Sequence, residues 1–284
     1  MAKTQDIKRR IRSVRNTMQL TKAMKMVAAA KLRRAQERML KARPYAHGLQ
    51  TVLRSLAARD HPEVPPLLQV HGDKRVEIVV ITADKGLCGA FNSGIIRTAE
   101  MFAEGQYEKE LTYNTVGKKG RDYFKRRVKL TRELVDVFQV VEFSLAKQIA
   151  EDLMERYQNE ELDRIHLVYN EFKSAIQAKP VVQQLLPVEP AQLAAGESAD
   201  EYLYEPSAEK LFAQLLPHYV ENQVFHAMLE SAAAEHAARM TAMESASNNA
   251  GELIESLTLT MNRVRQAAIT TEIIEVVSGA EALS

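Results

Sequence analysis

The chain has 284 residues, of which 46% are hydrophobic and 26% charged, a balance typical of a globular protein with one large or two modest domains. Aromatic residues make up 6% and Trp is absent, so a large aromatic binding surface is not expected. The net charge of +1 hides an asymmetry: residues 1–58 hold 15 Lys and Arg against two acidic residues, whereas residues 207–284 hold ten Glu against four basic residues. Opposite charge at the two ends of the chain favours their side-by-side pairing.

Cys88 is the only cysteine, which argues against a disulfide framework and favours a reducing compartment. No run approaches the ~18–20 apolar residues of a membrane span. The basic N-terminus lacks the apolar core and small-residue cleavage site of a secretory signal. We therefore expect neither a membrane span nor a secretory signal.

Residues 1–58 are predicted to form one long helix. Pro44 would kink or end it, and we expect a kink because the apolar spacing continues beyond it. Apolar or small residues recur at intervals of three and four, the period of a coiled-coil seam: Ile7, Ile11, Val14, Met18, Ala28, Leu32, Ala35, Met39, Ala42, Ala46, Leu49, Leu53 and Leu56.

The apolar stripe of this first helix changes around Met24. Thr21 and Lys25 interrupt the seam, while Leu20, Met24 and Val27 form a second apolar row beside it. A two-stranded pair needs one seam, so a second row indicates that a further surface touches the helix at this level. A drift of the stripe around a straight helix explains the pattern equally well.

The middle of the chain reads as a small α/β domain, residues 74–190, that follows a proline-rich loop at His61 to Gly72. Strands alternate with helices, which predicts a mostly parallel sheet. We expect strands at Val76 to Ala83, Leu111 to Val116, Arg164 to Phe172 and Val181 to Leu186, the last antiparallel, and helices at Asn92 to Phe102, Lys118 to Arg127 and Phe143 to Tyr157. Val135 to Val141 is left uncertain.

Residues 207–284 are predicted to form a second long helix, with Ser207 as its N-cap and a bend at Pro217. From His218 to Ser278 there is no proline and one glycine; at ~1.5 Å per residue this stretch spans ~90 Å. A compact chain of this length has a radius of gyration of only ~19 Å. The helix therefore needs a partner along its length, and residues 1–58 are the candidate.

The two halves of this helix differ in composition. The first half is rich in small residues that allow close helix pairing: Ala227, Ser231, Ala234, Ala238, Ala242 and Ser245. Because the N-terminal helix is shorter, antiparallel pairing leaves one end of the longer helix unpaired. Ile273, Ile274, Val276 and Val277 make that end apolar on too many sides for free solvent, so we expect another surface to enclose it.

No catalytic or metal-binding constellation emerges. Gly86 and Gly89 lie between a strand and a helix, but no phosphate-loop or dinucleotide fingerprint is present, so a plain turn is favoured, with Asp84 and Lys85 as solvated charges. No two of the seven His are spaced at i, i+4, and Cys88 stands alone, so a metal site is not expected. No Ser occupies a nucleophile motif.

The basic first helix could bind nucleic-acid phosphates. Its charge is spread around the helix without interleaved aromatic residues, and an acidic helix is expected alongside, so a solvated face with interhelical pairing is favoured. A third interpretation is that the basic face meets an acidic protein surface.

Both ends of the chain resemble the γ subunit family of bacterial F-type ATP synthases. The start, IKRRIRSVRNTMQLTKAMKMVAAAKLRRAQ, and the end, MNRVRQAAITTEIIEVVSGAEAL, are highly specific motifs, and ITADKGLCGAFN, ARMTAMESASNNA and YLYEPS also match. The resemblance covers the whole chain in order. The paired cysteines of the chloroplast redox insert are absent, so thiol regulation of that type is not implied.

The resemblance implies a fold of α/β type plus a long coiled coil. The N- and C-terminal helices, 1–58 and 207–284, form an antiparallel left-handed coiled coil, and a central Rossmann-like α/β domain lies between them in the sequence. It implies a non-catalytic rotor that couples ion-driven c-ring rotation to ATP synthesis or hydrolysis in a hexamer of three α and three β subunits. The ε subunit and the c-ring are further partners. Nucleotide and Mg²⁺ are expected on α and β rather than here, and the location is the cytoplasmic face of the cell membrane, peripheral through the c-ring. The alternative is a basic coiled-coil nucleic-acid-binding protein, and an enzyme built on the α/β domain comes third.

The resemblance also assigns contact residues. Contacts with β subunits are expected at Met24, Arg239, Arg265, Gln266 and Thr270, to which we add Lys22, Lys25 and either Arg33 or Arg34 for acidic β surfaces. The axle tip inside the hexamer sleeve is expected at Ile273 to Leu283, including Ile274, Val276 and Val277. Tyr202 and Glu205 are expected to face the c-ring and ε.

Overall fold

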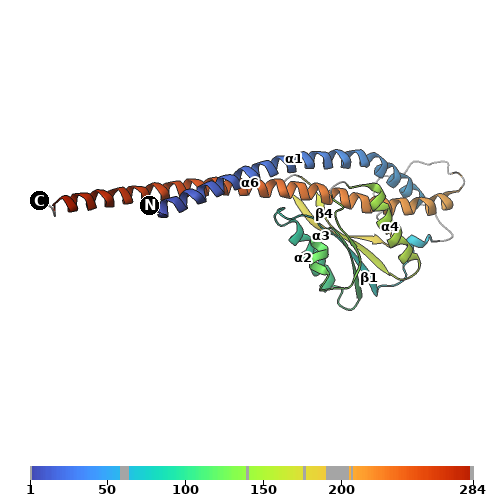
Figure 1. Ribbon diagram of the computed structural model, residues 1–284. Coiled ribbons are helices and arrows are strands. Elements are labelled where there is room, and N and C mark those ends of the chain that lie inside the picture. The colour runs from blue at the N-terminus through green and yellow to red at the C-terminus, as the bar shows by residue number, and fades with distance from the viewer. Residues whose placement is uncertain are drawn as a thin grey trace. The chain divides into compact units, whose positions relative to one another are not determined.

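A computed structural model describes residues 2–57, 64–138, 141–174, 177–189, 205 and 207–281. The two ends of the chain form long helices, α1 (Ala2–Ala57) and α6 (Ala208–Glu281), which run alongside each other (Figure 1). The chain divides into two compact units, one of residues 1–28 with 240–284 and the other of residues 29–239, and both helices pass through both units.

The segment between the long helices is an α/β domain, as predicted, and its sheet has five strands. Its elements are η1 (Pro66–Leu68), β1 (Arg75–Ile81), α2 (Phe91–Glu104), β2 (Glu110–Val116), α3 (Lys118–Phe124), β3 (Leu130–Leu134), α4 (Phe143–Gln158), β4 (Arg164–Phe172) and β5 (Ala178–Leu186). The predicted fold class, a mixed α/β sheet with long N- and C-terminal helices, is therefore confirmed.

The sheet has the strand order β3-β2-β1-β4-β5. β1 lies between β2 and β4 and is parallel to both, whereas β5 runs antiparallel to β4, as predicted from the short link between them. A central strand in a parallel sheet is covered on both faces. This explains why β1 reads as an almost continuous apolar run that only Glu77 interrupts.

The edge strand β3 was missed in the sequence. It spans Leu130–Leu134, where half-buried Leu130, Arg132 and Leu134 alternate with exposed Thr131 and Glu133, and it pairs only with β2. The uncertain segment Val135 to Val141 follows this strand; its described residues 135–138 and 141 lie outside any helix or strand. An edge strand with one half-buried face lacks the long apolar run from which a buried strand is predicted.

Helices cover both faces of the sheet. On one face, Ile78 and Val80 of β1 pack in a core cluster with Ile95 of α2 and Phe124 of α3. On the other face, the buried carboxylate of Glu77 forms an ion pair with Arg156 of α4 at 2.6 Å. The sheet is thus packed on both faces, and exposed side chains of the domain lie on the loops and on the flanking helices.

Both long helices continue past their prolines. α1 includes Pro44 and α6 includes Pro217, so neither proline ends its helix. The predicted N-cap of α6 is confirmed, because the backbone N–H of Lys210 donates to Ser207 Oγ at 3.4 Å.

The small residues of α6 serve the sheet as well as the neighbouring helix. Ser231 Oγ accepts a hydrogen bond from the backbone N–H of Asn170 in β4 at 3.3 Å, and Ala234 joins the core cluster around Ile78. Ala232, on the same stretch of α6, lines a cavity together with Ala35 of α1. Small side chains at these positions let α6 approach two neighbours closely.

Candidate functional site

The first unit is built from the start of α1 and the second half of α6. Thr21 Oγ1 lies 2.9 Å from Ser247 Oγ, and Lys25 Nζ forms an ion pair with Glu244 Oε1 at 2.6 Å. Rising numbers on α1 meet falling numbers on α6, so the two helices are antiparallel here.

The seam between these helices runs through Thr21 and Ala28, which are both buried. Thr21, which interrupts the apolar pattern in the sequence, belongs to the seam through its hydroxyl contact. The second apolar row lies outside the seam: Leu20 and Val27 are exposed, and Met24 is half-buried. This row is therefore available to a further surface.

Among the basic residues proposed for acidic partners, Lys22 and Lys25 differ. Lys22 is exposed, whereas Lys25 is already paired with Glu244 within the chain. An exposed ion pair of this kind contributes about 0–1 kcal/mol, so it does not prevent Lys25 from exchanging partners.

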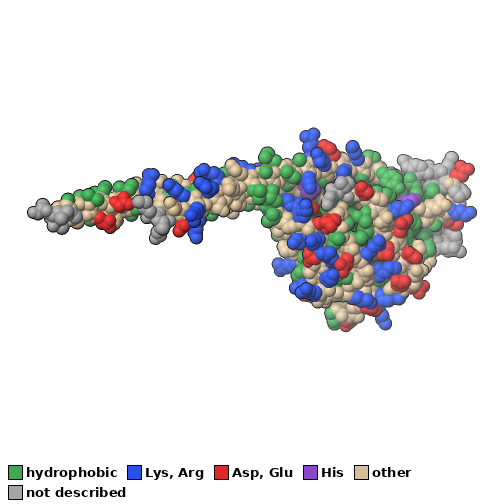
Figure 2. Space-filling model, viewed as in Figure 1, with side chains coloured by type: hydrophobic (Ala, Val, Ile, Leu, Met, Phe, Trp, Pro, Cys, Tyr) green, Lys and Arg blue, Asp and Glu red, His purple; other side chains and the backbone are tan. Residues whose placement is uncertain are grey.

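The end of α6 presents both polar and apolar side chains. Arg265, Gln266 and Thr270 are all exposed, and Thr270 Oγ1 donates a hydrogen bond to the backbone carbonyl of Gln266 at 3.0 Å. If the antiparallel pairing is extended residue by residue from Thr21 and Ser247, the beginning of α1 lies opposite Gln266 of α6. The residues after Gln266 therefore lie beyond the reach of α1. Figure 2 shows hydrophobic side chains along this end of the helix.

The apolar residues of this end are exposed as the sequence analysis anticipated for an unpaired segment. Ile273, Ile274 and Val277 are each more than half exposed, and Val276 is 71% exposed. Leu283, the last residue of the proposed axle tip, lies outside the described residues.

Arg239 lies in the second unit and points inward. Its guanidinium forms an ion pair with Glu235 at 2.7 Å and donates to the carbonyl oxygen of Gly86 at 3.2 Å, and its side chain is 13% exposed. Arg239 therefore fastens the loop after β1 to α6. A predicted contact with a β subunit would use only the remaining exposed part.

The loop after β1 is more ordered by hydrogen bonds than the sequence suggested. Asp84 is not a solvated charge: its Oδ1 accepts from the backbone N–H groups of Lys118 at 3.0 Å and Asp136 at 2.9 Å, and its Oδ2 accepts from Phe138 at 3.2 Å. One carboxylate thus joins three segments. The carbonyl oxygen of Gly86 in the same loop accepts a hydrogen bond from Arg239.

The structure separates Arg33 from Arg34. Arg33 is 84% exposed and pairs with Glu37 one turn along at 3.2 Å. Arg34 instead lines a cavity with Lys31, Arg38 and His236. Lys31, Arg38 and His236 were not predicted from the sequence, although the spacing of 31, 34 and 38 places three cations on one helix face.

Glu205 is exposed, and Tyr202 lies outside the described residues. Within the described ranges, no group of three His, Cys, Asp or Glu side chains is arranged to hold a metal ion. None of the described helices is long and apolar enough to cross a membrane.

Comparisons with known proteins agree on one family. The ATP synthase family model matches residues 3–283. The ATP synthase gamma chain of Heliobacterium modesticaldum is 52% identical over 98% of both chains, and that of Geobacter metallireducens is 48% identical over 100% of this chain and 99% of the relative.

Solved structures give the same result. A chain of the central stalk and c-ring of Tetrahymena thermophila mitochondrial ATP synthase is 33% identical, with a TM-score of 0.61, over 80% of this chain and 99% of that one. A rotor chain of Euglena gracilis mitochondrial ATP synthase, 22% identical with a TM-score of 0.67 over 94% and 99%, shares the fold. The chain therefore belongs to the ATP synthase gamma chain family.

Proposed function

We propose that this chain is the central shaft of an ATP synthase, which couples ion-driven rotation of a c-ring to ATP synthesis or hydrolysis in a hexamer of three α and three β subunits. The observation that carries the proposal is the full-length identity of about one half to ATP synthase gamma chains. The nucleic-acid alternative is less favoured, since two basic residues of α1, Lys25 and Arg33, are engaged by carboxylates of the chain itself.

The mechanism follows from symmetry. One asymmetric shaft inside a threefold ring cannot contact three β subunits identically. Each β subunit is therefore held in a different conformation with a different nucleotide affinity. Turning the shaft exchanges these contacts, so rotation and nucleotide affinity are coupled in both directions. The shaft needs no catalytic group of its own for this task, and nucleotide and Mg²⁺ are held by α and β.

The exposed surfaces of the first unit supply the contacts. Met24 and Lys22 on α1, with Arg265, Gln266 and Thr270 on α6, face solvent at least in part and are proposed to meet β subunits. The apolar side chains from Ile273 onward are proposed to turn in an apolar sleeve. Fully burying such a side chain contributes about 1.5–3 kcal/mol, so their enclosure favours assembly.

The c-ring and ε subunit are proposed to lie against the segment of Tyr202 and Glu205. The chain would then be held at the cytoplasmic face of the membrane only through the c-ring.

The test is reconstitution with matching α and β subunits. The expected product contains one copy of this chain per three α and three β, measured by native mass spectrometry, with ATPase activity that depends on the chain. If α and β assemble and the chain stays outside the product, the proposal is wrong, and salt-dependent binding of the chain to DNA would then support the nucleic-acid alternative.

A further inference from the structure

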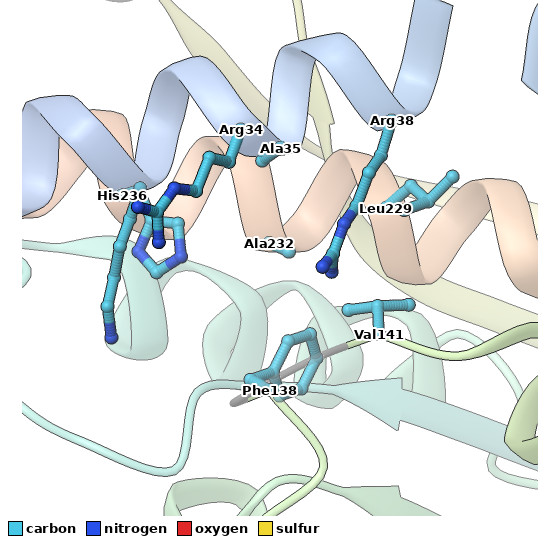
Figure 3. A pocket seen from close by; sticks show the side chains of 9 residues that line it. Arg34, Ala35, Arg38, Phe138, Val141, Leu229, Ala232 and His236 are labelled. Atoms are coloured by element: carbon cyan, nitrogen blue, oxygen red, sulfur yellow. The ribbon is translucent and has the colours of Figure 1, made fainter. Parts of the chain in front are cut away.

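A cavity of about 120 Å³ lies within the second unit, between α1, α6 and the segment that follows β3 (Figure 3). Its apolar walls are Ala35, Leu229, Ala232, Phe138 and Val141, and its polar residues are Lys31, Arg34, Arg38 and His236. All nine residues belong to the same compact unit.

Three cations line this cavity from one face of α1. Lys31, Arg34 and Arg38 are three and four residues apart, so their side chains follow one another along the helix. Figure 3 shows Arg38 extending from α1 toward Phe138 and Val141. Within the described part of the chain, none of the three has an ion-pair partner.

His236 adds a buried polar group to the same cavity. Its side chain is 8% exposed, and its Nδ1 is buried without a hydrogen-bond partner among the described residues. Burial, together with the positive charges of Arg239 and Lys31, lowers the pKa of His236 to about 4. The imidazole is thus neutral at pH 7 and sits in a positive potential.

Three carboxylates on the neighbouring segments are engaged by other groups. Glu235 of α6 pairs with Arg239 at 2.7 Å, Glu37 of α1 pairs with Arg33 at 3.2 Å, and Asp84 accepts a hydrogen bond from the backbone N–H of Phe138 at 3.2 Å. None of these three carboxylates forms an ion pair with Lys31, Arg34 or Arg38, although the charge of Lys31 acts on Glu235 at longer range.

We propose that this cavity binds a phosphate dianion, either inorganic phosphate or the terminal phosphate of a nucleotide. Phosphate oxygens accept paired hydrogen bonds from guanidinium groups such as those of Arg34 and Arg38. A phosphate monoester carries a charge of about −1.5 to −2 at pH 7, so it neutralises more of the charge of three cations than a single carboxylate does. His236 lines the same cavity, so a bound dianion lies near its ring.

Lys31, Arg34 and Arg38 are all exposed, so the site is open to solvent on the side of α1. A bound dianion favours the imidazolium form, so it raises the pKa of His236. This coupling gives the site a readout that a merely structural role of the cations would not produce.

The experiment titrates the full-length chain with inorganic phosphate at constant ionic strength. Binding is followed by calorimetry, and the ring of His236 by ¹⁵N NMR. Arg34→Gln and Arg38→Gln remove one cation each. Arg33→Gln removes the same charge one position away on the exposed face and is the matched control.

We expect saturable binding that each cavity variant weakens about tenfold, a factor that corresponds to 1.4 kcal/mol. The control should bind as the unmodified chain does, and phosphate should raise the pKa of His236 by about one unit or more in the unmodified chain only. Circular dichroism before each titration verifies that the variants are folded.

A second titration with ATP distinguishes the two sources of the ligand. Tighter binding of ATP than of phosphate, through the same two arginines, assigns the site to a nucleotide phosphate, and the reverse order assigns it to inorganic phosphate. Absence of saturable binding of both ligands overturns the proposal, as does equal weakening by Arg33→Gln. Binding of a Glu-rich peptide where phosphate fails also overturns it and makes the cavity a protein contact.

Discussion

The hydroxyl oxygens of Thr21 and Ser247 lie 2.9 Å apart in the buried seam between α1 and α6. Each also has a backbone acceptor, since both hydroxyls lie within hydrogen-bond reach of the carbonyl oxygen of Met18, at 3.0 Å and 3.3 Å respectively. This polar pair fixes which residues of the two helices face each other, a task that uniform small or apolar side chains perform less specifically.

Replacing Thr21 with Val removes one hydroxyl at nearly constant shape. The free energy of unfolding of the chain should fall by about 1 kcal/mol, because the buried contact between the two hydroxyls is lost and Ser247 keeps only the carbonyl oxygen of Met18. Urea unfolding followed by circular dichroism measures this. Thr17→Val is the control, since that hydroxyl bonds only to Ser13 O on an exposed face. Equal loss in both variants would show that the buried pair contributes nothing specific.

Arg239→Gln should destabilise the isolated chain by about 3 kcal/mol, because the buried carboxylate of Glu235 loses its counterion. The double variant with Glu235→Gln should recover most of this loss. Both are measured by urea unfolding of the chain alone. If Arg239→Gln leaves stability unchanged and lowers only the activity of the assembled enzyme, the inward role described for Arg239 is wrong.

Asp163 should make stability depend on acid pH. Burial acts to raise its pKa, but the guanidinium of Arg75 and the backbone N–H groups of Arg75 and Lys74 overcome that effect and hold the pKa at about 2. A carboxyl whose pKa is lower in the folded than in the unfolded chain stabilises the fold above the unfolded value, 3.8, and this contribution is lost as pH falls toward 2.

The expected difference in free energy of unfolding between the unmodified chain and Asp163→Asn is about 2–3 kcal/mol at pH 7, and it should shrink between about pH 4 and pH 2. Urea unfolding at a series of pH values measures it. Asp122→Asn serves as the exposed control and should change stability little. A difference that is constant with pH would exclude ionisation of Asp163 as its source.

Changing Arg265 and Gln266 together to Ala should lower the coupled ATPase activity of the reconstituted enzyme. Both side chains are exposed, so the unfolding free energy of the chain itself should change by no more than about 0.5 kcal/mol. Arg263→Ala, an exposed cation close by on α6, is the matched control. Unchanged turnover in the double variant would remove these residues from the proposed contact with β.

Changing Ile273, Ile274 and Val276 to Ser should leave the stability of the isolated chain unaltered, because these side chains are already exposed. The hexamer that contains this variant should dissociate more readily, since each lost apolar side chain costs about 1 kcal/mol or more of burial. Native mass spectrometry after dilution measures the dissociation. Tyr107→Ser, which changes an exposed residue of the α/β domain, is the control and should have no effect. If the triple variant dissociates no faster than the unmodified hexamer, the proposed enclosure of this end of α6 in an apolar sleeve is wrong.

The fold was largely readable from the sequence because buried strands and long helices leave strong patterns. The apolar run of β1 and the alternation of β4 predicted both strands, and Ser207 marked the beginning of α6. β3 was missed because Thr131 and Glu133 break its apolar character at the sheet edge. Thr21 was taken as an interruption of the seam, because a buried hydroxyl pair between residues 226 apart leaves no local pattern.

The candidate surfaces were less predictable than the fold. The exposed end of α6 follows from helix length alone, and the resemblance supplied the residues around it. Whether a given charge faces inward depends on tertiary contacts, which is why Asp84 and Arg239 were read as more exposed than they are. The cation face of Lys31, Arg34 and Arg38 is visible in the spacing, but the cavity that it lines needs Phe138 and His236 from distant segments.

Rotation of the chain within the reconstituted hexamer tests the shaft role most directly. Glu108→Cys places a reactive thiol on an exposed turn of the α/β domain, whereas the only native cysteine, Cys88, is buried and should not react. A bead attached there should turn in one direction when ATP is added, with three pauses per turn. Hydrolysis of ATP by a hexamer that contains the chain while the bead stays still would contradict the rotor role.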